Sequence, residues 1–148
     1  MVKTEAEIIN RIREEASLLG ACRLTDSFTS FVKGARILFL PHILEFCTSR
    51  SFPFLEQWEA MEQTAGGLEI FNIFLNSGKI ETEPQGDIAL IGKTDGIIRI
   101  SGCDRRHTVL LMHGASATII ASRYAVVKVE KSNDCKVNII TDSTSIVL

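Results

Sequence analysis

The last third of the chain, from Asp87 to Leu148, alternates short aliphatic and β-branched runs with polar turns. Such alternation is typical of half-buried strands, which stiff β-branched side chains favour. Within these runs, residues of one class recur every 19 positions: Ile91, Leu110, Val129 and Leu148, and Ala89, Thr108, Val127 and Ile146. A fixed step of this kind predicts a β-solenoid, in which equivalent residues stack from coil to coil.

Two architectures are compatible with these strands. In a solenoid, each coil of about 19 residues holds two strands and two turns. In an antiparallel sheet or sandwich, segments such as GKTDG, HGAS and KSND serve as hairpin loops. We favour the solenoid, because an antiparallel meander does not require a recurrence every 19 positions, and keep the antiparallel sheet as the alternative. In the 19-residue register, one interior stack contains Ile91, Leu110, Val129 and Leu148.

The first part of the chain has the apolar spacing of helices. A helix is predicted over residues 4–20, with Thr4 as its N-cap and one apolar face that contains Ile8, Ile9, Ile12, Ala16 and Leu19. Shorter helices are predicted from about residue 27 to Gly34, on either side of Pro41, and from about residue 51 to Gly66. The segment 68–78 satisfies neither the helical nor the strand period cleanly.

Composition divides the chain near residue 85. All eight phenylalanines and the single tryptophan lie at or before residue 74, whereas Val, Ile and Thr make up 21 of the last 62 residues against 16 of the first 86. We therefore predict an α+β chain with a helical head over residues 1–84 and a β-solenoid tail over residues 85–148. A terminal coil exposes unpaired backbone groups, so we expect the head to cap the N-terminal end of the solenoid.

Charge and targeting signals give little indication of a partner. Residues 1–86 hold 8 basic and 12 acidic side chains and residues 87–148 hold 8 and 6, so the halves carry −4 and +2. These values are too small to predict a nucleic-acid partner. We see no secretory signal, and the apolar stretch 35–46 is shorter than the roughly 20 residues that span a bilayer. The four cysteines form no CxxC pair, so we predict a cytoplasmic chain with free thiols and no membrane partner.

No catalytic or metal-ligand motif accompanies the repeat. His107 and His113 flank one strand with Cys103 and Asp104 nearby, but no ligand spacing of a metal site is present. We interpret both histidines as turn residues or strand ends on the surface of the solenoid. Three glutamates, Glu56, Glu59 and Glu62, are interpreted as the solvated side of a helix. Neither GxSxG nor a phosphate-binding loop occurs. We predict no catalytic, cofactor or metal residues.

Basic side chains of the tail are interpreted as a solvated face. They are Arg105, Arg106, Arg123, Lys128, Lys131 and Lys136. In the 19-residue register Arg123 is followed by Asp142, which interrupts any basic stripe. His42, beside Pro41 in an apolar run, is interpreted as a partly buried structural histidine.

The other end of the solenoid is the candidate interaction site. Its last residues, Ile146, Val147 and Leu148, are apolar, and nothing later in the sequence provides a cap. We expect this end to pack against another protein or a second copy of the chain.

Two segments carry a resemblance to a known group. The segment FPFLEQWEAMEQ (52–63) and the run SATIIASRYAVVKVEKSNDCKVNII (116–140) resemble poorly characterised bacterial proteins, often associated with phages or mobile elements, that join a short helical head to a tail of small β-coils. The Asp-Asn turns of such coils are reduced here to Asn133-Asp134 and Asp142-Ser143. The resemblance implies the fold and a genomic setting, and it implies no site residues.

Two classes of function follow. We favour a non-enzymatic structural or protein-interaction module, in which the solenoid is a rigid scaffold capped by the head. The alternative is a ligand- or carbohydrate-binding or enzymatic β-helix. Hexapeptide acyltransferases need a six-residue period, and sugar-binding coils need aromatic platforms, whereas this tail contains a single tyrosine.

Overall fold

The computed structural model describes residues 4–21 and 23–148. Within them, helices α1 (Glu5–Leu18), α2 (Phe31–Leu38), α3 (Pro41–Arg50) and α4 (Leu55–Ala65) precede the strands, together with the short 3-10 helices η1 (Arg23–Ser27) and η2 (Glu69–Phe71). The strands are β1 (Ile73–Leu75), β2 (Gly78–Thr82), β3 (Ile88–Ile91), β4 (Thr94–Ser101), β5 (Arg106–Met112), β6 (Ser116–Ser122), β7 (Val126–Lys131), β8 (Lys136–Thr141) and β9 (Ile146–Val147).

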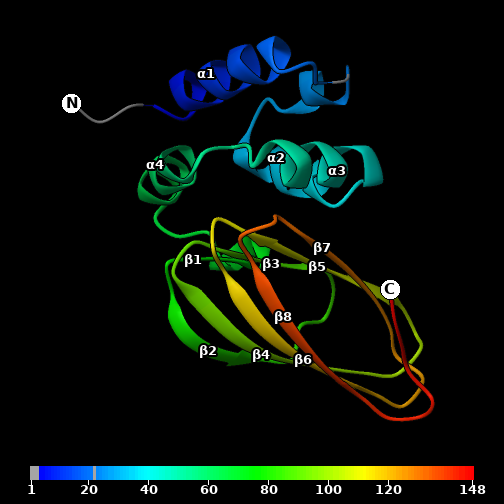
Figure 1. Cartoon of the computed structure of the whole chain (residues 1–148). Helices are drawn as coiled ribbons and strands as arrows, with labels where there is room; N and C mark the ends of the chain where they lie inside the picture. The colour runs from blue at the N-terminus through cyan, green and yellow to red at the C-terminus, as the bar shows by residue number, and fades with distance from the viewer. Residues whose placement is uncertain (1–3, 22) are drawn as a thin grey trace.

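The strands form two parallel sheets, and successive strands alternate between them (Figure 1). The first sheet has the order β1-β3-β5-β7-β9, which we call sheet A, and the second has the order β2-β4-β6-β8, which we call sheet B. Each coil therefore contributes one strand to each sheet. The prediction of a helical region followed by a β-solenoid is confirmed, and the antiparallel alternative is wrong because every strand pairing is parallel.

The step between coils differs from the predicted 19 residues. Ile73 pairs with Ala89, Ile88 with Val109, Arg106 with Val126, and Val126 with Ile146, which gives steps of 16, 21, 20 and 20. In this register Leu110 pairs with Ala89 and Glu130. The predicted interior stack is therefore wrong, because a one-residue change of register exchanges the two faces of a strand.

Strands β3 and β5 of sheet A are buried on both faces, and the two sets of side chains belong to different cores. Toward the solenoid interior lie Ile88, Leu90, Val109, Leu111 and Val127. On the opposite face, the neighbouring residues Ala89, Ile91, Leu110 and Met112 pack with the helices. Two members of the predicted interior stack, Ile91 and Leu110, thus belong to the interface with the head. This double burial explains the unbroken apolar runs IALI and TVLLM.

The helices lie over the flank of the solenoid, above sheet A (Figure 1). Their buried residues, among them Ile12, Leu44 and Trp58, form one core with Leu110 and Met112 of β5. Helix α3 also contacts β7. The expectation that the head caps the first coil was therefore wrong in position, because the large apolar surface that needs cover is the outer face of sheet A. The first coil also begins earlier than residue 85, since β1 and β2 come from residues 73–82.

Local signals explain most helix ends. Thr4 accepts a hydrogen bond from the Glu7 amide at 3.2 Å, as predicted for the N-cap of α1. Ser30 caps α2 in the same way, so this helix begins at Phe31 and continues past Gly34. The predicted stop at Gly34 was wrong, because this glycine admits the ring of Phe28, which a Cβ at Gly34 would meet at 2.5 Å. Pro41 occupies the first turn of α3 and separates it from α2.

Burial of both faces of β5 predicts equal sensitivity of two adjacent leucines. Replacing Leu110 or Leu111, both 0% exposed, by alanine is expected to lower the free energy of unfolding by about 2–5 kcal/mol. Thr118→Ala on the outer face of sheet B should change it by less than about 0.5 kcal/mol. Chemical denaturation of the three variants measures these values. A Leu110→Ala cost no larger than that of Thr118→Ala would contradict a helical layer packed on sheet A.

Candidate functional site: the exposed last coil

The interior stack of sheet B ends on an exposed side chain. Ile98, Ile119 and Ile139 are paired in register through β4, β6 and β8. Ile98 and Ile119 are 0% exposed, whereas Ile139 is 48% exposed, because no strand in the described structure follows β8 in the sheet. Ile139 therefore occupies an interior position but is about half exposed, whereas Ile98 and Ile119 in the preceding coils are fully buried.

The edge of β8 also presents unpaired backbone groups. The amides of Lys136 and Asp142 donate to Ala115 and Ala121, on the β6 side. Along a strand, successive residues direct their N–H and C=O groups to opposite sides. The groups of the intervening odd-numbered residues, Val137, Ile139 and Thr141, therefore point to the free edge. This edge has both apolar side chains and an open hydrogen-bonding ladder.

The predicted interaction residues lie in the same coil, at the end of sheet A. Ile146 is 55% exposed and Leu148 is 66% exposed, whereas Val147 is partly buried against the interior core. Strand β9 pairs with β7 alone in the described structure. Sequence reasoning did not identify Ile139 and Ile140 of β8, although Ile140 is 56% exposed. They were missed because only the last three residues were considered as the uncovered end of the solenoid.

Side chains of the last turn hold the turn of the preceding coil. Arg123 and Tyr124 have positive φ angles of 55° and 65°, so their amides point together toward the next coil. The Arg123 amide donates to Oδ2 of Asp142 at 3.2 Å, and the Tyr124 amide donates to Oγ1 of Thr144 at 2.9 Å. The Ala125 amide donates to Oγ of Ser145 at 3.2 Å.

The carboxylate of Asp142 organises this turn. Its Oδ1 accepts from the Thr144 amide at 3.0 Å, the Thr144 hydroxyl at 2.7 Å and the Ser145 amide at 3.1 Å. The Thr144 hydroxyl and the amides of Arg123 and Thr144 lower the pKa of Asp142 to about 2. In the 19-residue register, Asp142 followed Arg123 as a charge that interrupts a basic stripe. The carboxylate instead binds the backbone of Arg123.

His107 in β5 and His113, which follows this strand directly, both have structural contacts. His107 is buried, and its Nδ1 lies 3.0 Å from the carbonyl oxygen of Gly86. His113 Nε2 lies 2.6 Å from the carbonyl oxygen of Pro53 and so joins the solenoid to the head. Their interpretation as surface residues of the coil was wrong for His107. His42 is exposed, so its predicted partial burial was also wrong.

No metal or thiol site is evident in the described residues. Among them, no group of three or more His, Cys, Asp or Glu side chains could hold a metal ion. The described cysteines, Cys47, Cys103 and Cys135, are free thiols, and Cys22 lies outside the described residues.

The glutamates of α4 differ in exposure. Glu56 and Glu59 are exposed, as predicted, but Glu62 is half-buried, and one of its carboxylate oxygens is buried without a hydrogen-bond partner. Burial, followed by the charges of Glu69 and Glu59, raises the pKa of Glu62. A single unpaired carboxylate among like charges offers no acid–base pair.

The basic residues of the tail are spread over different faces. Lys128 lies on the helix-facing side of sheet A and forms an ion pair with Glu130 at 3.2 Å, whereas Lys136 lies on the exterior of sheet B. Arg105 donates a hydrogen bond to the carbonyl oxygen of Gln85. These positions do not form one basic stripe.

Comparisons with family models, with curated proteins and with solved structures give no match for this chain. The resemblance to phage-associated proteins therefore stays a prediction. None of the helices in the described part of the chain has the length and apolar character needed to cross a bilayer.

The Asp142 turn predicts a pH-dependent contribution to stability. An aspartate in the unfolded chain has a pKa of about 3.9. Because the folded pKa is lower, the stabilisation from ionised Asp142 is fully present above about pH 4 and is lost as the pH falls toward about 2. Asp142→Asn should therefore lower the melting temperature at pH 7 and speed amide exchange of Arg123, and the difference from wild type should vanish below about pH 2. Asp95→Asn, at an exposed position on β4, is the matched control. An equal loss of melting temperature in this variant would contradict a specific role of Asp142 in stabilising the turn.

Proposed function

We propose that this protein is a structural or protein-interaction module whose last coil docks another protein chain. The solenoid supplies a rigid support, and the surface that binds is the free edge of β8 together with β9. The half-exposed interior residue Ile139 is the observation that carries the proposal. Ile140, Ile146 and Leu148 of the same coil are exposed too, on the outer faces of the two sheets.

Strand addition is the binding mode that this surface favours. An incoming strand would satisfy the free N–H and C=O groups of β8 and would also cover Ile139. Main-chain hydrogen bonds supply affinity in such complexes, and the pockets for alternate side chains supply specificity. An open edge with exposed isoleucines is otherwise a template for unwanted pairing.

A second copy of the chain is the partner that the edge itself supports best. Two β8 strands can run antiparallel with Ile139 at the twofold axis. The backbone N–H and C=O groups of Val137, Ile139 and Thr141 then face the same groups of the other copy. In that register Ile139 lies opposite Ile139, and Lys136 lies opposite Asp142 of the other copy. A shift of two residues that places Asn138 at the axis would set Asp134 opposite Asp142, so like charges would meet. The first register is therefore the favoured one.

The alternative of a carbohydrate-binding or catalytic solenoid has less support. Such a site would need stacked aromatic side chains or convergent carboxylates on the coils. Tyr124 is the one aromatic residue after Phe74, and the carboxylate of Asp142 is occupied by backbone and hydroxyl donors.

The decisive experiment compares two isoleucine-to-lysine variants. Ile139→Lys places a charge at the free edge, whereas Ile70→Lys places the same charge at a position that is 82% exposed in η2. We expect wild type and Ile70→Lys to have a mass of twice 16.4 kDa by sedimentation at high concentration. Ile139→Lys should have the mass of the monomer.

A strictly monomeric wild type would contradict pairing of two copies, and the free edge would then be offered to a different protein. If the wild type is a dimer, an equal mass for Ile139→Lys would contradict docking through β8. The lysine is placed on an already half-exposed side chain, so both variants should keep the circular dichroism and melting temperature of the wild type.

A further inference from the structure

The two ends of the solenoid present different strand edges. Sheet B ends on β8 in the last coil and on β2 in the first coil, and in the described structure no strand lies beyond either of them. Two such edges allow serial stacking, in which β8 of one copy pairs with β2 of the next. Serial stacking gives an open filament, because the repeated contact follows the solenoid axis and does not close into a ring. The edge of the first coil therefore decides how far assembly through β8 extends.

In sheet A, the backbone of the first coil's edge strand is partly bonded within its own chain. The Asn76 amide donates toward β3, so the alternate residues Ile73 and Leu75 direct their backbone groups away from β3. The Ile73 amide donates to the carbonyl oxygen of Leu68 at 3.3 Å, and the carbonyl oxygen of Leu75 accepts from Oγ of Ser77 at 3.3 Å. These bonds occupy part of the ladder that a further strand would need.

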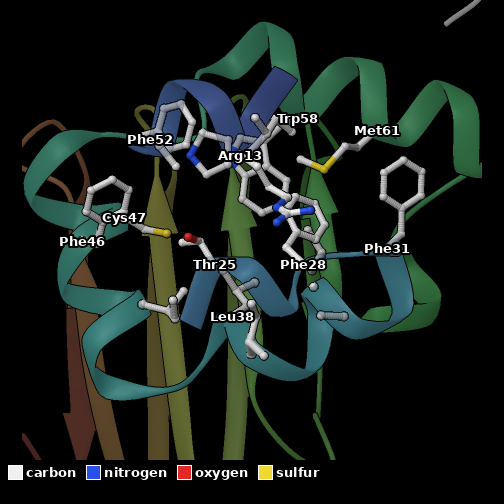
Figure 2. A pocket seen from close by; sticks show the side chains of 18 of the residues that line it. Arg13, Thr25, Phe28, Phe31, Leu38, Phe46, Cys47, Phe52, Trp58 and Met61 are labelled. Carbon is white, nitrogen blue, oxygen red and sulfur yellow. The ribbon is translucent and has the colours of Figure 1, made fainter. Parts of the chain in front are cut away.

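The helices cover the same strand. Both α4 and η2 pack against β1, and Ile73 and Leu75 are buried. Ile73 lines the apolar pocket among the helices, which Figure 2 shows with Trp58 and Met61 of α4 labelled. With three residues, β1 is also short, and short edge strands are one way in which proteins prevent unwanted pairing. In sheet A, the first coil therefore has no edge suited to a further strand.

The edge of β2 in sheet B is protected by charge. The Gly78 amide donates to the carbonyl oxygen of Lys93, so Lys79 and Glu81 direct their backbone groups to the free side. The side chains of Lys79 and Glu81 are both exposed, and Pro84, which has no N–H, follows the strand. Charged side chains, lysine above all, and proline are the residues with which natural proteins protect edge strands.

One row of sheet B ends in a lysine on both sides. Across the four strands, this row contains Lys79, Asp95, Ser116 and Lys136. Serial stacking in the register that continues the coils sets Lys79 of one copy opposite Lys136 of the next. The same register places Ile80 over Val137 in the interior, so the apolar side chains alone would accept this contact. Like charges directly opposite each other in a sheet destabilise the pairing.

Lys136 distinguishes the two ways of using the β8 edge. In the twofold pair with Ile139 at the axis, Lys136 lies opposite Asp142 of the other copy, and the charges attract. In serial stacking Lys136 lies opposite Lys79, and the charges repel. Specificity of this kind combines an attractive contact in the favoured complex with a repulsive contact in its competitor.

Given the docking through β8 that we propose, we infer that the first coil is a closed end, meaning an end that accepts no further strand. Assembly then stops at two chains related by a twofold axis. Pairing of two β8 strands uses both docking edges at once, and the outer ends of the pair are the protected first coils. The position of Lys79 and Lys136 in one row is the observation that favours the pair over the filament.

Reversal of one charge tests this inference on the full chain. Lys136→Glu sets a carboxylate opposite Lys79 in serial stacking and opposite Asp142 in the twofold pair, so it favours the filament and opposes the pair. The change from repulsion to attraction should strengthen serial stacking about tenfold. Sedimentation equilibrium at low salt should then show masses above that of two chains, which rise with protein concentration and fall as salt is added. Lys93→Glu makes the same change at an exposed turn position and should sediment like the wild type.

The double variant Lys79→Glu/Lys136→Glu restores like charges in the row, so the large assemblies should disappear. Growth of the double variant equal to that of Lys136→Glu, or no growth of Lys136→Glu beyond two chains, would overturn the closed end. A wild type that grows beyond two chains would overturn it as well. A monomeric wild type contradicts only the twofold pair, because serial stacking of Lys136→Glu does not require that pair. Lys79 and Lys136 are exposed, so circular dichroism should show wild-type folding in all variants.

Discussion

Burial of β3 and β5 on both faces is the constraint on which the rest of this structure depends. A coil of two short strands has a narrow interior, and its outer surface would ordinarily meet water. Here the outer face of β3 and β5 is as apolar as the inner one, so it needs a second layer. The helices provide that layer, and their own core is completed by Leu110 and Met112. Head and solenoid are therefore two halves of one packed unit.

The architecture could be predicted because two signals agreed, the β-branched alternation and the recurrence of residue class along the tail. The register could not be predicted, because turns of unequal length give steps of 16, 21, 20 and 20 residues between successive coils. In β5, adjacent leucines at 110 and 111 face different cores, and residue class alone does not distinguish them. A 19-residue recurrence therefore matched strands correctly while it assigned Ile91 and Leu110 to the wrong face.

Long-range polar contacts were beyond the reach of sequence reasoning for a similar reason. The bond between His113 and Pro53 joins residues 60 positions apart and depends on the position of the helices over the flank. Asp142 accepts a hydrogen bond from the backbone amide of Arg123. This amide points toward the next coil because Arg123 has a left-handed conformation. Of the candidate site, the terminal residues 146–148 were identified from apolarity, whereas Ile139 required the true register.

The position of the helical layer also determines which part of the solenoid stays uncovered, namely the edge of β8. Helices over a sheet face bury side chains, but they cannot pair with the edge of a parallel strand. At the edge of β8, the backbone groups of Val137, Ile139 and Thr141 lie in the plane of sheet B, while the helices cover sheet A. Only another strand offers N–H and C=O groups at the required spacing and an apolar side chain above Ile139. A partner for this edge is therefore expected to add a strand, whatever else it contributes.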